Sequence, residues 1–293
     1  MLYFEERLIA EQIKNHLLSQ DLFDPNQMAY RKGFSTQTAL IKFMDDVRHA
    51  ADVRRVTIAV FFDFTKAFDN VDHRLLISKL RQLHFSSTSL RWLCDYLCRR
   101  TQAVRDPVSG EISAMNVVTR GVPQGSVLGP LLFTLYLSDF SAVLKNCKYG
   151  FYADDLLIYV HAEPGTLNNA ILKMNEDIVR VVEWASSNKL TLNAKKTNAM
   201  ILGTSRFVKN IARNNPPHII VDGTDLPYSE SIVYLGVTIS NTLSWEKQVS
   251  RTVSKVNAAL YQIKLCGNLF PLSLRTRLVT TLIFPIFDYC CPY

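Results

Sequence analysis

Lys148-Tyr149-Gly150-Phe151-Tyr152-Ala153-Asp154-Asp155-Leu156-Leu157-Ile158-Tyr159-Val160 places two adjacent carboxylates between two apolar runs. The aromatic and β-branched residues on both sides predict a β-hairpin with the acids at its tip. Burying Asp154 and Asp155 together without a cation costs on the order of several kcal/mol, because like charges repel and lose hydration. Mg²⁺ would suit such hard oxygen ligands. Taken alone, the pair fits an exposed turn better, since Asp also favours turns.

The composition is that of a folded protein with excess positive charge. Of the 293 residues, 48% are hydrophobic and 20% are charged, a balance that argues against a disordered chain. The length allows a large core or two to three subdomains. The formal net charge of +7 favours a polyanionic partner such as nucleic acid.

Cysteine spacing and hydropathy argue against several classes of protein. Without a CxxC pair or a histidine-rich partner spacing, neither a zinc site nor a disulfide framework is indicated. Acids and an arginine interrupt the apolar N-terminus, and no apolar run approaches about 18 residues. We therefore expect an intracellular, non-secreted protein, in the nucleus or the cytoplasm, with no membrane partner. The cysteines are Cys94, Cys98, Cys147, Cys266, Cys290 and Cys291.

A third candidate acid follows another apolar run. Residues 56–62 read as a buried strand that delivers Asp63 at its end, and no local turn or cap explains that acid. Asp69 and Asp72 precede a helix, where Asp69 is expected as the N-cap with Asp72 three residues later. Both are therefore interpreted as capping residues rather than ligands.

Apolar periodicity predicts the scaffold. Helices are expected over residues 1–20, 37–51, 74–83, 89–97, 130–137, 167–184 and 245–263. Two short strands are expected within 189–203, a loop over 210–217 and one strand over 234–239. Because strands and helices do not alternate as regular βαβ units, an α+β architecture is favoured.

Two segments carry candidates for phosphate or nucleotide binding. Arg31 and Lys32 lie beside a glycine before a helix, and this pair could either grip phosphate or form a solvated basic turn. Gly121 and Gly125 flank Gln124 in a loop that opens a helix, where backbone amides can approach a phosphate or base pair. No lysine follows as in a GxxxxGK[ST] phosphate loop, which argues against that class of nucleoside triphosphatase.

A basic stripe marks the helix predicted over residues 245–263. Lys247, Arg251 and Lys255 recur at i, i+4 and i+8, a spacing that could track a phosphate backbone. Spacing alone favours an ordinary solvated helix face.

Taken in chain order, these segments resemble the reverse transcriptases of non-LTR retrotransposons, most closely the jockey-like elements of the LINE class. An ordered series is far more specific than any one of its motifs. The resemblance implies a right-hand polymerase fold: fingers from residues 1–55 and 74–120, a palm with an antiparallel sheet from 56–73 and 121–243, and a partial thumb from 244–293. The matching segments are Arg31–Ala39, Val60–His73, Arg100–Val104, Gly121–Phe133, Tyr152–Asp155, Leu192–Met200 and Tyr234–Ile239.

The resemblance implies an RNA-directed DNA polymerase that adds deoxynucleotides to a primer 3′-end by a two-metal mechanism. Asp63, Asp154 and Asp155 would hold two Mg²⁺ ions, with Mn²⁺ as a substitute. Lys196 would be the general acid for pyrophosphate, a role that Lys195 could take instead. The implied partners are an RNA template, a DNA primer and deoxynucleoside triphosphates, with no small-molecule cofactor.

The resemblance also assigns contacts to nucleotide and duplex. Phe68 matches the bulky residue that crowds the sugar 2′-position, and Arg31 matches the fingers arginine that holds the triphosphate. The nucleotide pocket would also include Gln124, Gly125 and Tyr152. The residues expected to contact nucleic acid are Arg100, Gly121, Lys247, Arg251 and Lys255.

Two departures limit what the resemblance implies. Ala29-Tyr30 stand where the family usually has Gly-Phe, which is a mild change. We expect no endonuclease segment before residue 1 and an end within a thumb-like region, so autonomous insertion is not expected. The alternatives left open are an inactive retrotransposon remnant that binds RNA or primer–template duplex, and a metal-dependent nuclease.

Overall fold

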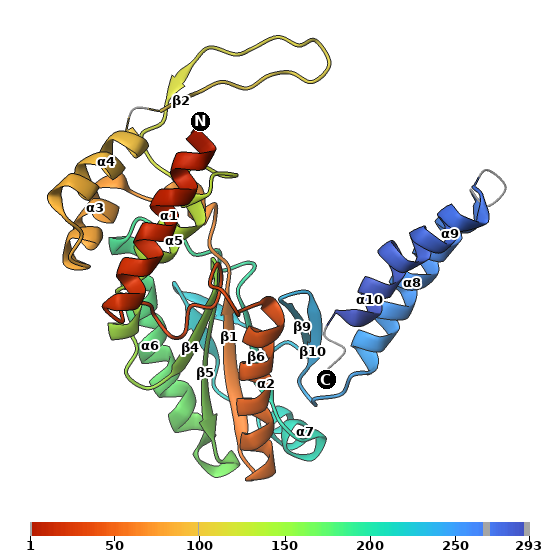
Figure 1. The fold of residues 1–293 in the computed structure, drawn as a ribbon. Coiled ribbons are helices and arrows are strands. Elements are labelled where there is room, and N and C mark those ends of the chain that lie inside the picture. Colours follow the sequence, from red (N-terminus) through yellow and green to blue (C-terminus); the bar gives the residue numbers. More distant parts are fainter. Residues whose placement is uncertain (1, 99, 266–269, 290–293) are drawn as a thin grey trace.

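An antiparallel sheet forms the centre of the chain in the computed structural model, which describes residues 2–98, 100–265 and 270–289. Its strand order is β4-β5-β1-β6, and β1 pairs with β5 on one side and β6 on the other (Figure 1). Every residue of β1 is buried, as its continuous apolar run predicts. The expected α+β architecture is confirmed. The four strands are β1 (Val56–Phe62), β4 (Lys148–Tyr152), β5 (Asp155–Ala162) and β6 (Asn198–Leu202).

Both faces of this sheet are covered. Val56, Ile58, Val60 and Phe62 point to one face and share a core with α1 (Leu2–Ser19), α3 (His73–Gln82), α5 (Leu128–Tyr136) and α6 (Leu167–Ser187). Ala59 and Phe61 point to the other face. There they pack with α2 (Thr36–Asp52) and with the hairpin of β9 (Ser231–Tyr234) and β10 (Val237–Ser240). The alternation of a central strand thus serves two cores.

Helix caps explain where two of these helices begin. Ser35 caps α2 through a reciprocal capping box with Thr38. The expected N-cap at Asp69 is wrong, because Asp69 lies inside a short 3₁₀ turn, η1 (Ala67–Asn70). The chain becomes extended only at Asp72, whose carboxylate accepts the N–H groups of Arg74 at 2.9 Å and Leu75 at 3.1 Å.

Three other predictions of secondary structure need correction. Residues 189–203 contain one strand, β6, and an isolated bridge from Leu192 to Phe64 instead of a second strand. The expected loop over 210–217 begins inside α7 (Ser205–Arg213), which buries Val208 and Ile211.

The strand predicted over 234–239 is a hairpin, the third correction. Leu235 and Gly236 turn the chain with φ of +45° and +82°, and β9 and β10 pair antiparallel around them. An apolar leucine in a left-handed conformation carries no local turn signal, so the run reads as continuous.

The parts expected as fingers and thumb extend from this body. The ribbon of β2 (Thr101–Gln102) and β3 (Asn116–Val117) follows α4 (Ser87–Cys98) and projects away from the sheet (Figure 1). At the other side, α8 (Glu246–Leu265) leaves the body and α9 (Leu272–Leu278), the π-helical turn η4 (Val279–Ile283) and α10 (Phe284–Asp288) return along it. The remaining elements are η2 (Phe140–Ala142), η3 (Pro164–Thr166), β7 (Ile219–Val221) and β8 (Thr224–Leu226).

The structure also bears on the expectations about membrane-spanning segments and cysteines. Among the described residues, no helix has the length and apolar character needed to cross a bilayer. Cys94, Cys98 and Cys147 are free thiols, while Cys266, Cys290 and Cys291 lie outside the described residues.

Candidate active site

The hairpin predicted around the acid pair is confirmed. Tyr152 pairs with Asp155 across the turn, and Ala153 takes a left-handed conformation with φ of +56°. In the neighbouring pair of strands, Phe62 lies opposite Leu156. One further step along this register sets Asp63 opposite Asp155, so acids from two separate strands meet at one edge of the sheet.

These carboxylates influence one another. Burial raises the pKa of the Asp154 carboxyl, and repulsion from Asp63 raises it further. A hydrogen bond from the backbone N–H of Asp154 itself opposes this rise. Asp155 keeps exposed surface, yet crowding of its carboxyl by protein and then repulsion from Asp154 and Asp63 raise its pKa to about 6. Such mutual repulsion is what a bound cation would relieve.

The donor set fits a hard divalent cation, although its geometry is not that of a finished metal site. Carboxylate oxygens are the ligands that Mg²⁺ prefers, and Asp63, Asp154 and Asp155 supply only such oxygens. Within residues 2–98, 100–265 and 270–289, no three His, Cys, Asp or Glu side chains already stand close enough to coordinate one ion. The metal assignment therefore remains a prediction for these three residues.

Lys196 lies beside two of the acids. Asp63, Asp155 and Lys196 line one hollow of about 140 Å³, which we call the acid hollow. The chain before Lys196 is held against the end of β1, because the Asn193 N–H donates to the Asp63 carbonyl at 2.8 Å. Lys195 does not line the hollow, so the structure favours Lys196 over its neighbour for a role there.

The glycine-containing loop predicted to contact nucleotide packs against the turn that follows β1. The Gly121 N–H donates to the Val71 carbonyl at 2.8 Å, and the Val122 N–H donates to the Phe68 carbonyl at 2.9 Å. Gly121 has φ of +88°, and an added Cβ would lie 2.9 Å from the Asp69 carbonyl oxygen. Only glycine allows this approach. Gly125, also left-handed, faces open space.

Gln124 and Phe68 are fixed by neighbours. Gln124 Nε2 donates to Asp69 Oδ1 at 2.8 Å, so Asp69, expected as a helix cap, instead orients the glutamine. The Phe68 ring stacks on Phe133 with centroids 4.2 Å apart. Gln124 and Gly121 line a groove of about 640 Å³ that Arg100 also lines. This brings three of the predicted nucleotide and nucleic-acid contacts to one surface.

Arg31 is engaged within its own segment. Its guanidinium lies between the rings of Phe23 and Phe34, 4.9 and 4.7 Å from their centroids. It also donates to the carbonyls of Asp24 at 2.9 Å and Gln27 at 3.3 Å. These contacts anchor the segment, and binding of a triphosphate by Arg31 stays a prediction.

Two tyrosines stand near the acid pair. The pKa of Tyr30 is raised first by partial burial and then by electrostatic interaction with Asp154 and Tyr152. Tyr30 occupies the position where the family usually has Phe. Tyr152, a predicted nucleotide contact, is the last residue of β4 and pairs with Asp155.

Gln27 is the residue that sequence reasoning missed. Its side chain is 2% exposed and hydrogen-bonds to the backbone of Ala153, directly before the acid pair. A lone glutamine in a polar segment carries no sequence signal, and the contact spans 126 residues.

The basic stripe of α8 divides into two parts. Lys247 donates to Ser231 Oγ at 3.1 Å, and Arg251 donates to Thr238 Oγ1 at 3.2 Å. Both side chains therefore attach α8 to the β9–β10 hairpin. Lys255 is exposed and makes no hydrogen bond or ion pair within the part of the chain that the structure describes. Nucleic-acid binding by all three remains a prediction.

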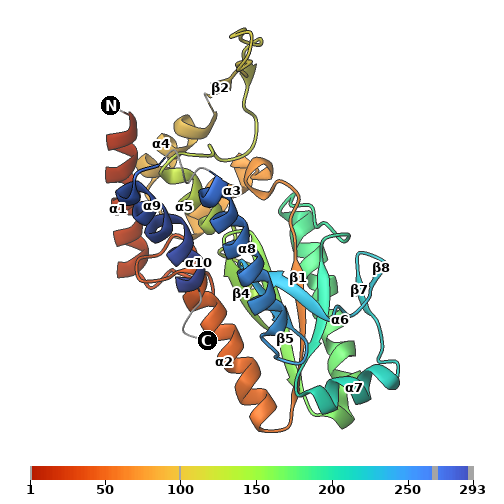
Figure 2. The same ribbon diagram turned by 90° about the vertical axis from the view of Figure 1, so that its right-hand side faces the viewer.

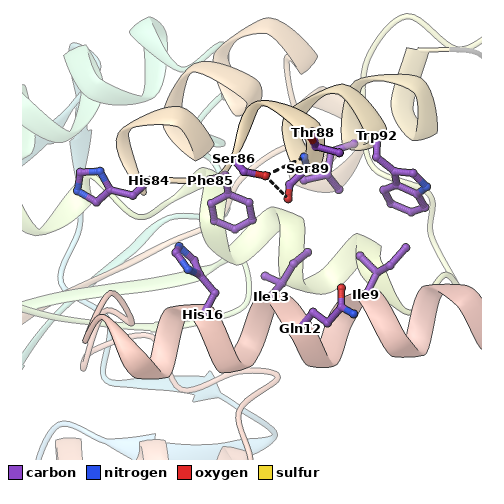
Figure 3. A pocket seen from close by; sticks show the side chains of 11 residues that line it. Ile9, Gln12, Ile13, His16, His84, Phe85, Ser86, Thr88, Ser89 and Trp92 are labelled. Carbon is purple, nitrogen blue, oxygen red and sulfur yellow. Dashed lines mark hydrogen bonds between the residues drawn. The ribbon is translucent and has the colours of Figure 1, made fainter.

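A separate hollow of about 450 Å³ lies between α1 and α4 (Figure 3). Ile9 and Ile13 of α1 face it from one side, and Phe85 and Trp92 face it from the other. No carboxylate lines it, so this hollow is not part of the acid cluster.

An antiparallel sheet with carboxylates at the ends of two paired strands, near a glycine-containing loop, is the arrangement expected for the palm of a nucleic-acid polymerase. The family profile described as reverse transcriptase (RNA-dependent DNA polymerase) matches residues 2–239, and the chain belongs to this family.

Curated relatives agree with this family. The chain is 27% identical, over 98% of its length, to the probable RNA-directed DNA polymerase from transposon X-element of Drosophila melanogaster. It is 28% identical over 88% to that from transposon BS, and 24% identical over 76% to the RNA-directed DNA polymerase from mobile element jockey, both of the same species. These alignments cover 31%, 28% and 24% of the respective relatives, so the chain spans about a third of their length or less. The resemblance to jockey-like non-LTR elements is confirmed.

Solved structures confirm the fold. Apo telomerase from Candida tropicalis, truncated from the C-terminal domain, matches with a TM-score of 0.54 at 13% identity over 83% of this chain and 45% of that one. Telomerase from the same species in complex with the TWJ fragment of telomeric RNA matches with a TM-score of 0.55, also at 13% identity, over 97% and 45%. The right-hand polymerase fold is thereby confirmed.

Proposed function

We propose that this chain is the polymerase portion of an RNA-directed DNA polymerase that extends a primer 3′-end with deoxynucleotides. The observation that carries the proposal is geometric: Asp63 and Asp155 line one hollow at the end of the sheet, and Asp154 directly precedes Asp155. Burial first, and repulsion between these acids second, raise the pKa of Asp154 and of Asp155. Membership of the reverse transcriptase family and the names of the relatives support an RNA template and a DNA product.

The three carboxylates would hold two divalent ions, Mg²⁺ or Mn²⁺. Such ions activate an attacking hydroxyl and neutralise charge on a leaving pyrophosphate. From the acid hollow, Lys196 would supply a proton to that leaving group. Phe68, held by its stack on Phe133, would crowd a ribose 2′-hydroxyl and favour deoxynucleotides.

The groove beside the palm would receive nucleic acid. Arg100, Gly121 and Gln124 line it, and the guanidinium of Arg100 lies 4.9 Å from the ring centroid of Tyr96. The groove has a volume of about 640 Å³. Its cationic and amide groups suit phosphates and the edge of a nascent base pair.

Primer extension tests this function. A labelled DNA primer annealed to an RNA template is incubated with the purified chain, deoxynucleotides and either Mg²⁺, Mn²⁺ or a chelator. We expect extension with metal only, and its loss in Asp154→Asn. Asp225→Asn, at an exposed acid in β8, is the matched control and should retain the rate. Absence of extension by the unsubstituted chain, or full extension by Asp154→Asn, would overturn the proposal.

The same experiment separates the two alternatives. An inactive remnant would bind the duplex in a salt-dependent manner in a filter-binding assay, yet it would yield no extension product. A metal-dependent nuclease would shorten the labelled strand instead of lengthening it.

A further inference from the structure

The side chain of Gln27 holds the turn that precedes the acid pair. Its Nε2 donates to the Ala153 carbonyl at 3.2 Å, and its Oε1 accepts the Ala153 N–H at 3.2 Å. The same Oε1 accepts the Ala29 N–H at 3.0 Å. Because the glutamine is only 2% exposed, water cannot replace these bonds cheaply. One carboxamide therefore satisfies both backbone groups of a single turn residue.

Ala153 needs such support. Its φ of +56° lies in the left-handed region, which costs a residue with a Cβ about 1–2 kcal/mol. A strained turn persists when its surroundings over-determine it. Asp154 and Asp155 follow directly, so any rotation of the backbone at Ala153 displaces both carboxylates relative to Asp63.

The backbone around Gln27 is fixed as well. The Met28 N–H donates to the Phe151 carbonyl at 3.1 Å, and the Phe151 N–H donates to the Asn26 carbonyl at 2.8 Å. Gln27 and Phe151 form a parallel bridge, so this segment acts as an added strand at the free edge of β4. Arg31 then ties the next residues down through the Gln27 carbonyl.

We propose that Gln27 is a positioning residue for the Asp154–Asp155 turn, an inference that rests on the proposed polymerase function. Its carboxamide sets the place of both carboxylates relative to Asp63 and touches no substrate. This role needs a hydrogen-bond donor and an acceptor at the end of a side chain as long as that of glutamine. Methionine has the length without the amide, and asparagine has the amide without the length.

Positioning residues of this kind have a measurable effect. Loss of a group that orients metal ligands costs about 10- to 100-fold in metal affinity or activity. A displacement of about 1 Å at a reacting centre has an effect of similar size. A residue that only stabilised the fold would lower the unfolding temperature without changing either quantity well below that temperature.

The experiment compares Gln27→Met and Gln27→Asn with Gln248→Met. Gln248 is a matched control, since its Oε1 also accepts a backbone N–H, from Thr238 at 2.8 Å, and its Nε2 donates to Thr252, so its carboxamide bonds to β10 and α8 instead of the turn. Mn²⁺ binding is measured by electron paramagnetic resonance titration, extension by kcat and by KM for the nucleotide, and exposure of the turn by hydrogen exchange at the Ala153 amide.

For both Gln27 variants we expect the Kd for Mn²⁺ to rise about tenfold, kcat to fall 10- to 100-fold and Ala153 exchange to accelerate at least about tenfold. Gln248→Met should stay within about twofold of the unsubstituted chain. If one variant fails to fold, the other decides.

A folded Gln27 variant with unchanged Mn²⁺ affinity, kcat and Ala153 exchange would overturn the inference. The two proposals fail separately. An unsubstituted chain that extends nothing defeats the polymerase function, whereas the exchange and Mn²⁺ readouts still decide whether Gln27 holds the turn.

Discussion

The helices α6 and α8 have the same kind of apolar stripe and opposite surroundings. On α6, Ile171, Met174 and Ile178 are completely buried. On α8, Val249 and Val253 are 57% and 48% exposed. Periodicity therefore predicts that a helix has an apolar face, but not that the chain provides a partner to cover it.

Their positions explain the difference. α6 lies against the sheet and belongs to its larger core. In contrast, α8 departs from the body after Trp245 (Figure 1) and runs beside α9 and α10 (Figure 2). Of the α8 side chains, Val256 is buried. We infer that α6 supports the central sheet and that most of α8 is energetically separate from it.

The largest expected difference is in stability. Met174→Ala should lower the free energy of unfolding by about 2–5 kcal/mol, because it leaves a cavity in a fully buried stripe. Val253→Ala, at the corresponding face of α8, should change it by no more than about 0.5 kcal/mol. Urea unfolding measures both. Equal losses would show that the α8 face is covered after all.

A buried acid on α6 sharpens the comparison through pH. Burial by itself would raise the pKa of Asp177. Its carboxylate, however, accepts hydrogen bonds of 2.8–3.0 Å from the backbone N–H groups of Lys145, Asn146 and Cys147. These bonds hold the pKa of Asp177 below its usual value. A lowered folded pKa means that this stabilisation is present above the unfolded pKa of about 3.9 and is lost as pH falls through the folded value.

Asp177→Asn should therefore lose about 1–3 kcal/mol at pH 7 and converge with the unsubstituted chain in acid. Urea unfolding at a series of pH values from 7 downward measures the gap. A gap that stayed constant or widened in acid would contradict the stated direction.

Phe68 packs against the larger core and tests whether this side of the molecule also controls the choice of sugar. Phe68→Ala should raise ribonucleotide incorporation relative to deoxynucleotide about tenfold, because space opens where a 2′-hydroxyl would lie. Extension with single nucleotides of each kind gives the ratio. Val249→Ala on α8 is the control and should leave the ratio unchanged. An unaltered ratio in Phe68→Ala would remove this assignment.

The smallest effect is expected on α8. Lys255→Ala should reduce the slope of log affinity for primer–template against log salt by about 1, since one phosphate contact is lost. Lys247→Ala should do less, because Lys247 is already engaged with Ser231 and lies 3.7 Å from Glu230. Filter binding at several salt concentrations measures both slopes. Identical slopes for the two variants would show that the contacts of Lys247 with Ser231 and Glu230 do not weaken its interaction with nucleic acid.

Local signals were sufficient for the framework of the site. The apolar strand before Asp63 and the hairpin at Asp154 and Asp155 are each indicated by a pattern of a few neighbouring residues, and the sequence predicts both. The bonds that hold the site together were not. Gln27 reaches Ala153 across 126 residues, and Asp69 reaches Gln124 across 55. No neighbouring pattern marks such partners, because only the folded chain brings them together.

The central claim is that Asp63, which directly follows β1, and the acids of the β4–β5 hairpin form one catalytic unit. Single-turnover extension by Asp63→Asn, Asp154→Asn and the double variant tests it most directly. Groups that act as a unit are non-additive, so each single change should slow extension at least about a thousandfold and the double variant should be no slower than the slower single one. Normal extension by Asp63→Asn, or losses that multiply in the double variant, would contradict the account.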